Sequence, residues 1–167
     1  MQLVTMLVTV LFISLLPVQT KTLTPSDVAP VVEAREPGWE FIAGICSCPK
    51  LVSSQLSNSV GSWRRTNANG EKQIVLMQVY LIDSINEASE WMKGFENKTL
   101  GAQCRATKYS LGDESVELEC PINPGDTINA NHFIYVRKDN YLVEVQGSTS
   151  ESVERFAKYV SDLLPTG

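Results

Sequence analysis

Four cysteines carry the most specific chemistry in this chain of 167 residues. Cys46 and Cys48 are one residue apart, whereas Cys104 and Cys120 lie farther along the sequence. Structural disulfides, a thiol redox pair and a thiolate metal site all use such residues. Paired zinc ligands normally have two or more residues between them, and the common redox motif is C-x-x-C. Neither spacing is present, so the cysteines favour structural disulfides, with redox or metal chemistry at Cys46-x-Cys48 as the alternative.

The disulfide connectivity stays open in the sequence because two arrangements satisfy the geometry. On one strand, Cys46 and Cys48 have Cα atoms about 6.6 Å apart, so a direct bond between them requires a bend. A hairpin that turns at Gly112 places Cys104 opposite Cys120, and a bond there stabilises the fold by about 3 kcal/mol. Alternatively, each cysteine of the pair bonds one hairpin cysteine. Four cysteines allow three connectivities, and the sequence does not choose among them.

Trp63, Arg64 and Arg65 form the candidate ligand surface of the sequence. An aromatic ring beside two guanidinium groups suits an anionic or a stacking ligand. The competing interpretation is that Trp63 packs on Leu76 across a hairpin while the arginines are solvated.

A second candidate surface consists of Phe133, Tyr135 and Leu142. These side chains fall on one face of a predicted strand pair and are too apolar for open solvent. We expect either a helix that covers them or an interface with a partner.

No catalytic constellation stands out in the sequence. The chain contains no nucleophile elbow, no zinc-protease helix, no phosphate loop and no dinucleotide fingerprint. His132 is its single histidine, and such a residue is more often structural than a catalytic base. We therefore assign no catalytic residue, metal ligand or cofactor, and we favour a protein that is not an enzyme.

Residues 1–20 resemble an export signal. Leu3 to Leu16 form an apolar run interrupted only by Thr and Ser. This run is too short for a comfortable membrane span, which needs about 20 apolar residues. Val18 and Thr20 can occupy the −3 and −1 positions before a cut ahead of Lys21, although the usual pair of alanines is absent. We expect a secreted or periplasmic protein without a membrane span after cleavage, and an uncleaved N-terminal anchor is the alternative.

The composition is that of a globular domain. Apolar residues make up 43% of the chain and charged residues 20%, which argues against disorder. The net charge of −5 gives no general attraction to nucleic acid or to an anionic membrane. We expect the partner to be a protein or a small ligand, and we exclude nucleic acid.

Hairpins dominate the predicted secondary structure. An Asn-Gly step at 69–70 lies between two strand-like runs, which is a strong hairpin signal. A second hairpin centred on Gly112 pairs Arg105 with Glu119 and keeps its apolar residues on one face. Strands are expected over 39–46 (covered on both faces), 60–66, 72–83 (central), both arms of 103–120, 132–138 and 141–147.

Two amphipathic helices follow from capping signals. Residues 84–87 are a capping box, and Ile85 and Met92 belong to the apolar face of the helix that they begin. The last helix is expected to begin at 148–151 with a second capping box and to end before Pro165. A shorter helix over 27–35, capped by Ser26 and interrupted by Pro30, is expected in the proline-containing segment 21–37.

The predicted fold is a single α+β domain over residues 38–167. Its order is β-β-β-α-β-β-β-β-α, and hairpins outnumber crossovers, so the sheet is mainly antiparallel with two helices packed on it. For function, the sequence favours an exported, disulfide-stabilised and non-catalytic binding or interaction domain. The alternative is a small extracytoplasmic enzyme or a thiol redox or metal-binding protein.

Overall fold

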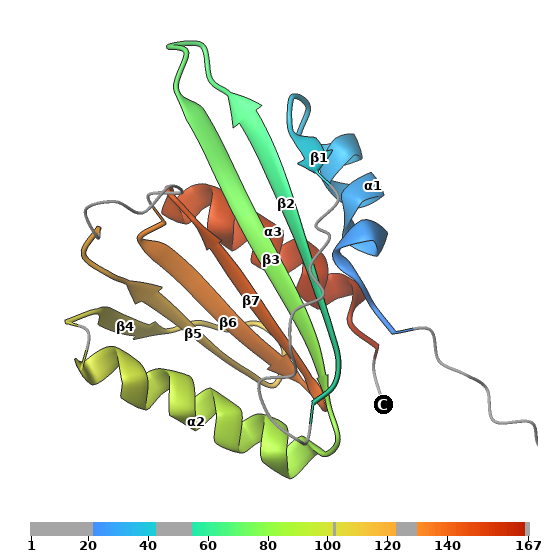
Figure 1. Cartoon of the computed structure of the whole chain (residues 1–167), viewed down its shortest axis with the longest axis vertical. Helices are drawn as coiled ribbons and strands as arrows, with labels where there is room; N and C mark the ends of the chain where they lie inside the picture. The colour runs from blue at the N-terminus through green and yellow to red at the C-terminus, as the bar shows by residue number, and fades with distance from the viewer. Residues whose placement is uncertain (1–21, 43–54, 102, 123–129, 166–167) are drawn as a thin grey trace, which may run out of the picture.

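A computed structural model shows an α+β fold in which helices flank an antiparallel sheet (Figure 1). It describes residues 22–42, 55–101, 103–122 and 130–165. The elements in chain order are α1 Pro25–Arg35, β1 Glu40–Ile42, β2 Gln55–Thr66, β3 Lys72–Ile82, α2 Ile85–Gly101, β4 Arg105–Lys108, β5 Glu114–Glu119, β6 His132–Lys138, β7 Tyr141–Gly147 and α3 Ser150–Leu163.

Seven strands of the described residues form one sheet in the order β1-β2-β3-β7-β6-β5-β4. Every neighbouring pair is antiparallel, and β7 is the central strand. The predicted fold class and antiparallel sheet are confirmed. The described part of the chain contains three helices and not two, because the proline-containing N-terminal segment forms a full helix against the sheet.

The hairpin of β2 and β3 confirms the turn predicted at the Asn-Gly step. The side-chain oxygen of Asn67 accepts hydrogen bonds from the backbone N–H groups of Asn69 and Glu71, at 3.0 and 2.9 Å. Gly70 has a φ of +81°, a conformation that glycine adopts without strain. The strand β2 begins at Gln55 and not near residue 60, so the polar stretch before Val60 belongs to the ladder.

The strand predicted over 39–46 is an edge strand in the structure. β1 pairs only with β2 among the described strands, and the side chain of Glu40 is 64% exposed. The expectation that this strand is covered on both faces is therefore wrong. Residues 43–46 lie outside the described residues.

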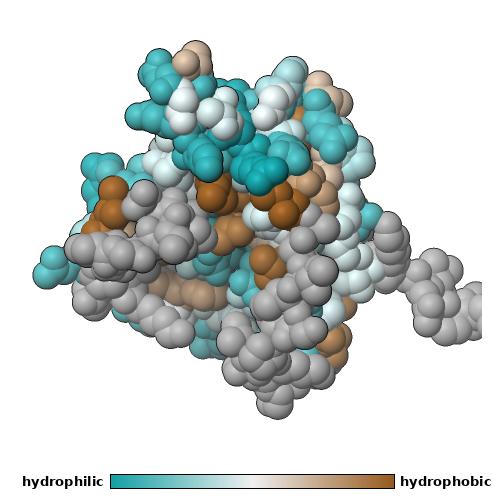
Figure 2. Space-filling view, turned by 45° about the horizontal axis from the view of Figure 1, so that its top comes forward, coloured by the Kyte–Doolittle hydropathy of each residue, from teal (hydrophilic) through white to brown (hydrophobic). Residues whose placement is uncertain are grey.

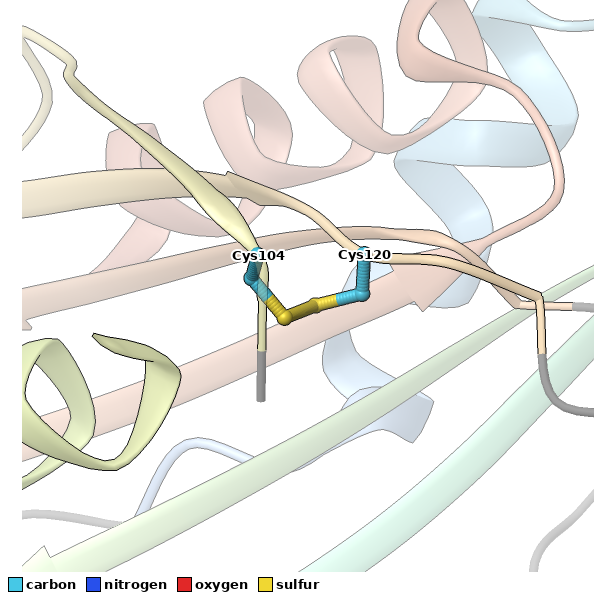
Figure 3. Close-up of a disulfide and its surroundings, with 2 residues drawn as sticks. All are labelled: Cys104 and Cys120. Atoms are coloured by element: carbon cyan, nitrogen blue, oxygen red, sulfur yellow. A yellow bond between two sulfur atoms is a disulfide. The ribbon is translucent and has the colours of Figure 1, made fainter. Parts of the chain in front are cut away.

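The β4–β5 hairpin has the predicted register. Arg105 pairs with Glu119 and Lys108 with Val116. The cysteines that continue this ladder, Cys104 and Cys120, are joined by a disulfide, with Cα atoms 4.2 Å apart (Figure 3). This bond contradicts the arrangement in which each hairpin cysteine bonds one member of the C-x-C pair. Cys46 and Cys48 lie outside the described residues.

One face of the sheet carries the larger hydrophobic core beneath α1 and α3. Phe156 of α3 is in edge contact with Trp63 and Trp39, with ring centroids 5.2 and 5.1 Å apart. Val28 and Val32 of α1 are completely buried in the same core. The helix α1 therefore belongs to the core of the domain, although the sequence analysis places segment 21–37 before the domain.

The other face of the sheet is covered at one end by α2. Ala88 and Met92 are buried, and the ring of Phe95 stacks on Tyr135 at 4.2 Å. The prediction that a helix covers the apolar face of β6 and β7 is confirmed. Ile85 was expected on the apolar face of α2 but is 52% exposed, because it stands in the first turn outside this contact.

The helix α1 begins earlier than predicted. Its N-cap is Thr24 and not Ser26, because the Asp27 carboxylate accepts hydrogen bonds from the Thr24 N–H and hydroxyl at 2.9 and 2.7 Å. The helix continues through Pro30, whose side chain is exposed.

The helix α3 begins later than predicted. Its N-cap is Thr149 and not Ser148. Glu151 does not complete a box with Ser148, because it forms an ion pair with Arg155 one turn further along.

The turn between β4 and β5 is locked against β6 at Gly112. Gly112 has a φ of +59°, and a Cβ atom there would lie 2.4 Å from the carbonyl oxygen of Arg137. The Arg137 side chain is 9% exposed and binds the carboxylates of Asp113 and Glu114, at 3.0 and 3.2 Å. The backbone contact and the two ion pairs together fix the hairpin that carries the disulfide.

Replacement of Gly112 by Ala should lower the free energy of unfolding by about 3 kcal/mol, from backbone strain and overlap with β6. Gly70→Ala is the matched control, because Gly70 also has positive φ but has no atom within 4 Å of the added Cβ. Urea unfolding should show a loss of only about 1 kcal/mol for the control. Equal losses for both variants would show that the Gly112 contact is not important.

Candidate functional site

The α2 side of the sheet is only half covered by the described elements. Figure 1 shows α2 across one end of the sheet, while β2 and β3 run on past it. Since side chains alternate along a strand, the positions on this side follow from the strand register. We define the open face as Ile42, Val60, Ser62, Ile74, Leu76 and Gln78.

A groove of about 470 Å³ lies at the outer end of this face. We call it the hairpin groove, because its walls come from β1 and from the two arms of the β2–β3 hairpin. Figure 2 shows that the hydrophilic surface of the molecule directly adjoins hydrophobic surface. The groove is lined by Glu40, Ile42, Arg64, Arg65, Thr66, Lys72 and Ile74.

An exposed ion pair crosses the groove between β1 and β2. Arg64 Nε donates to Glu40 Oε2 at 2.9 Å, and the two side chains are 57% and 64% exposed. The hydrogen bond and the charge of Arg64 hold the pKa of Glu40 below its ordinary value, and Glu40 raises the pKa of Arg64. Exposed pairs of this kind are weak, so Arg64 can exchange its carboxylate partner for another anion.

The structure does not bring the three residues of the predicted ligand surface together. Trp63 is completely buried on the opposite side of the sheet, where it contacts Phe41 and Phe156. It pairs with Val75 and not with the predicted Leu76. The three residues therefore do not form a single surface.

The two arginines also differ in their surroundings. The guanidinium of Arg65 lies 4.7 Å over the ring of Trp39, and its Nε donates to Gln73 Oε1 at 2.7 Å. Arg65 contributes to the wall of the groove, but Arg64 is the arginine whose side chain belongs to the α2 side of the sheet. Adjacent strand residues point to opposite faces, and this alternation separates the pair.

Two further polar residues of the groove are missed by the sequence prediction. Thr66 pairs directly with Lys72, and both side chains are exposed at the outer end of the groove. The register of the hairpin could have predicted both residues from the sequence. Pairing across the Asn-Gly turn puts Lys72 on the same face of the sheet as Arg64.

At the other end of the open face lies a half-buried acid. Glu144 is on the central strand, and its cross-strand neighbours are Gln78 and Tyr135. Burial raises the pKa of Glu144 to about 7, although a hydrogen bond with Tyr135 acts in the opposite direction. Burial and the nearby Glu144 also raise the pKa values of Tyr80 and Tyr135. The centre of the sheet thus holds a carboxyl group whose pKa is raised well above its ordinary value.

Amide side chains extend this polar row toward β2. Gln78 Nε2 donates to Asn58 Oδ1 at 2.9 Å. The Asn58 Nδ2 atom is buried and has no hydrogen-bond partner within the described residues. The open face therefore changes from cationic at the hairpin groove to amide and carboxyl groups at its centre.

A second cavity, of about 370 Å³, lies between α2 and the β4–β5 hairpin. Its lining includes two lysines, Lys93 and Lys108, and two acids, Asp113 and Glu114. Both acids already bind Arg137. Lys93 pairs with Glu90, so three cations, with Arg137 included, face three carboxylates, and the cavity has no surplus charge for a ligand.

His132 is half-buried at the start of β6, and none of the described residues forms a cluster of three metal-ligating side chains. None of the described helices has the length and apolarity required to cross a membrane. Comparison with protein-family models, curated proteins and solved structures finds no match.

Glu144→Gln should change how stability depends on pH. Because folding raises the pKa of Glu144 from 4.5 to about 7, the wild-type protein should lose stability as pH rises through that interval. The loss due to this group is about 3 kcal/mol and levels off above the folded pKa. The stability of the variant relative to wild type should rise by that amount across the same interval, as measured by urea unfolding at several pH values.

Glu90→Gln is the matched control, since Glu90 is an exposed acid on α2 that pairs with Lys93. Its stability relative to wild type should stay nearly constant over this pH interval. If Glu144→Gln behaves in the same way, Glu144 does not titrate near neutral pH.

Proposed function

We propose that this protein is an exported, non-catalytic binding domain that holds an anionic group in the hairpin groove. The observation that carries the proposal is the local charge. Arg64 and Lys72 face the groove beside one carboxylate, Glu40, and Arg65 adds to its wall, in a protein whose net charge is −5. A local positive surplus on an acidic protein attracts anions selectively.

The dimensions of the groove support a small ligand. Ligand sites commonly have volumes of about 300–1,000 Å³ and combine apolar walls with a few polar groups. The hairpin groove, at about 470 Å³, has Ile42 and Ile74 beside Arg64, Thr66 and Lys72. The hydroxyl and ammonium groups are hydrogen-bond donors, as an oxyanion requires.

The acid–base properties of the groove support binding and not catalysis. Glu40 is its carboxylate, and the neighbouring Arg64 keeps its pKa low. A carboxylate with a low pKa is a poor general base at neutral pH. The cations of the groove supply charge and hydrogen bonds, which suffice for recognition.

Export is supported by two separate features. The Cys104–Cys120 disulfide stabilises the described domain, and such bonds persist mainly in oxidising compartments. The first twenty residues have the sequence pattern of an export signal. We therefore place the protein outside the cytoplasm, either secreted or in a periplasm, with an uncleaved N-terminal anchor as the alternative form.

Inorganic sulfate should bind the mature protein in the groove, and Arg64→Gln should weaken this binding about tenfold, the effect of one charge-assisted hydrogen bond. Glu40→Gln should strengthen it about threefold, because it frees Arg64 from a weak competing pair. Calorimetric or NMR titration at low ionic strength measures both changes.

Arg105→Gln is the matched control. Arg105 forms an equivalent exposed cross-strand pair with Glu119 at the opposite end of the sheet. Its loss should leave sulfate affinity nearly unchanged. Equal weakening by the Arg64 and Arg105 variants would show a general charge effect and would contradict a site in the groove.

A further inference from the structure

The apolar part of the open face adjoins the hairpin groove directly. Ile74 pairs with Arg64 across the β2–β3 hairpin, and Leu76 pairs with Ser62. Ile42 pairs with Ser62 from the other side, so Ile42 and Leu76 flank one serine on the same face. We call Ile42, Ile74, Leu76 and Val60 the apolar strip.

The apolar strip is a surface that the described elements leave without a cover. Ile42 is 39% exposed although it is large and apolar, and Ile74, Leu76 and Val60 are half-buried. By contrast, Tyr80 and Ile82 on the same side of β3 are buried in the core beneath α2. A strip of this kind favours contact with an apolar group.

The strip has two ends of different chemistry. Its outer end meets the cations Arg64 and Lys72, and its inner end meets Gln78 and Glu144. Same-face residues of a strand repeat every 6.6 Å or so, which puts Ile74 about 13 Å from Gln78. A ligand on this surface therefore has an anionic end and a short apolar body.

We propose that the ligand is a monomeric, single-chain amphipathic anion. Its head group binds Arg64 and Lys72, and its chain lies along Ile74 and Leu76 toward the centre of the sheet. This inference rests on the proposed function, because the head group occupies the anion site of the hairpin groove. It adds the apolar body of the ligand and the path that this body follows.

A monomer fits the surface better than an anionic membrane does. The net charge of −5 opposes approach to a negatively charged bilayer. The strip is also bounded at its inner end by the polar side chains of Gln78 and Glu144, so it accommodates one short chain and not an extended lipid surface.

A series of alkyl sulfates tests this inference. Inorganic sulfate, butyl sulfate, hexyl sulfate and octyl sulfate are titrated into the mature protein, each below its critical micelle concentration. Affinity should rise about fourfold for each methylene group that leaves water, until the chain reaches the polar end of the strip. Octyl glucoside has the same chain without the charge and should bind much more weakly than octyl sulfate.

Variants locate the chain on the open face. Leu76→Asn and Val60→Asn should each reduce the gain in affinity per methylene while leaving inorganic sulfate affinity unchanged, because neither residue lines the hairpin groove. Ile85→Asn is the matched control, because Ile85 is an exposed apolar residue on α2, away from the strip. Thermal unfolding of all three variants shows which of them retain the native fold, and two strip variants keep the test possible if one fails to fold.

The outcomes separate this inference from the proposed function. Sulfate binding that depends on Arg64 but does not increase with chain length would overturn the amphipathic ligand and leave the anion site intact. Chain-length dependence with no effect of Arg64→Gln would contradict the anion site and the head-group placement together. Co-sedimentation with phosphatidylglycerol vesicles would show membrane association and would overturn the monomeric ligand.

Discussion

The structure depends on one sheet whose two faces are covered unequally. On one side, α1 and α3 pack over the strands, with Trp63 and Phe156 at the centre of the core. On the other side, α2 covers one end, and the described elements leave the outer parts of β1, β2 and β3 uncovered. The first side supplies most of the buried apolar surface and so stabilises the sheet. The ligand that we propose lies on the part of this second side that the described elements leave uncovered.

The chemistry of the open face follows from this division. Arg64 and Lys72 are exposed to solvent at the outer end of the face. Glu144 is half-buried at the centre of the sheet beside Tyr135, and desolvation favours its protonated form. The face thus presents cations at its solvent-exposed end and a carboxyl group of reduced charge near the core. This change in charge along the face suits a ligand with an anionic head and an apolar body.

Local patterns in the sequence predict much of the fold. The β4–β5 register is predictable because a shift by one residue would expose Leu118 and separate Arg105 from Glu119. The turn at Gly70 is predictable because its Asn-Gly signal is strong. Helix starts are harder, since Thr24 and Ser26 are both good caps and only the packing of α1 decides between them.

The candidate site is less predictable because it combines distant strands. The contact of Glu40 with Arg64 depends on the pairing of β1 with β2, which no turn signal specifies. Side chains alternate along a strand, so the sequence alone already indicates that Trp63 and Arg64 point to opposite faces of the sheet. Only one of them, Trp63, is buried in the core. Which part of the sheet α2 leaves uncovered is a property of the tertiary packing alone.

Intermolecular NOEs between a bound ligand and the methyl groups of the protein would show whether the ligand lies on the open face. Mature protein with labelled isoleucine and leucine methyl groups is mixed with octyl sulfate below its critical micelle concentration. We expect NOEs from the alkyl chain to Ile42, Ile74 and Leu76. NOEs confined to other exposed apolar residues, such as Ile85 and Ile122, would contradict it.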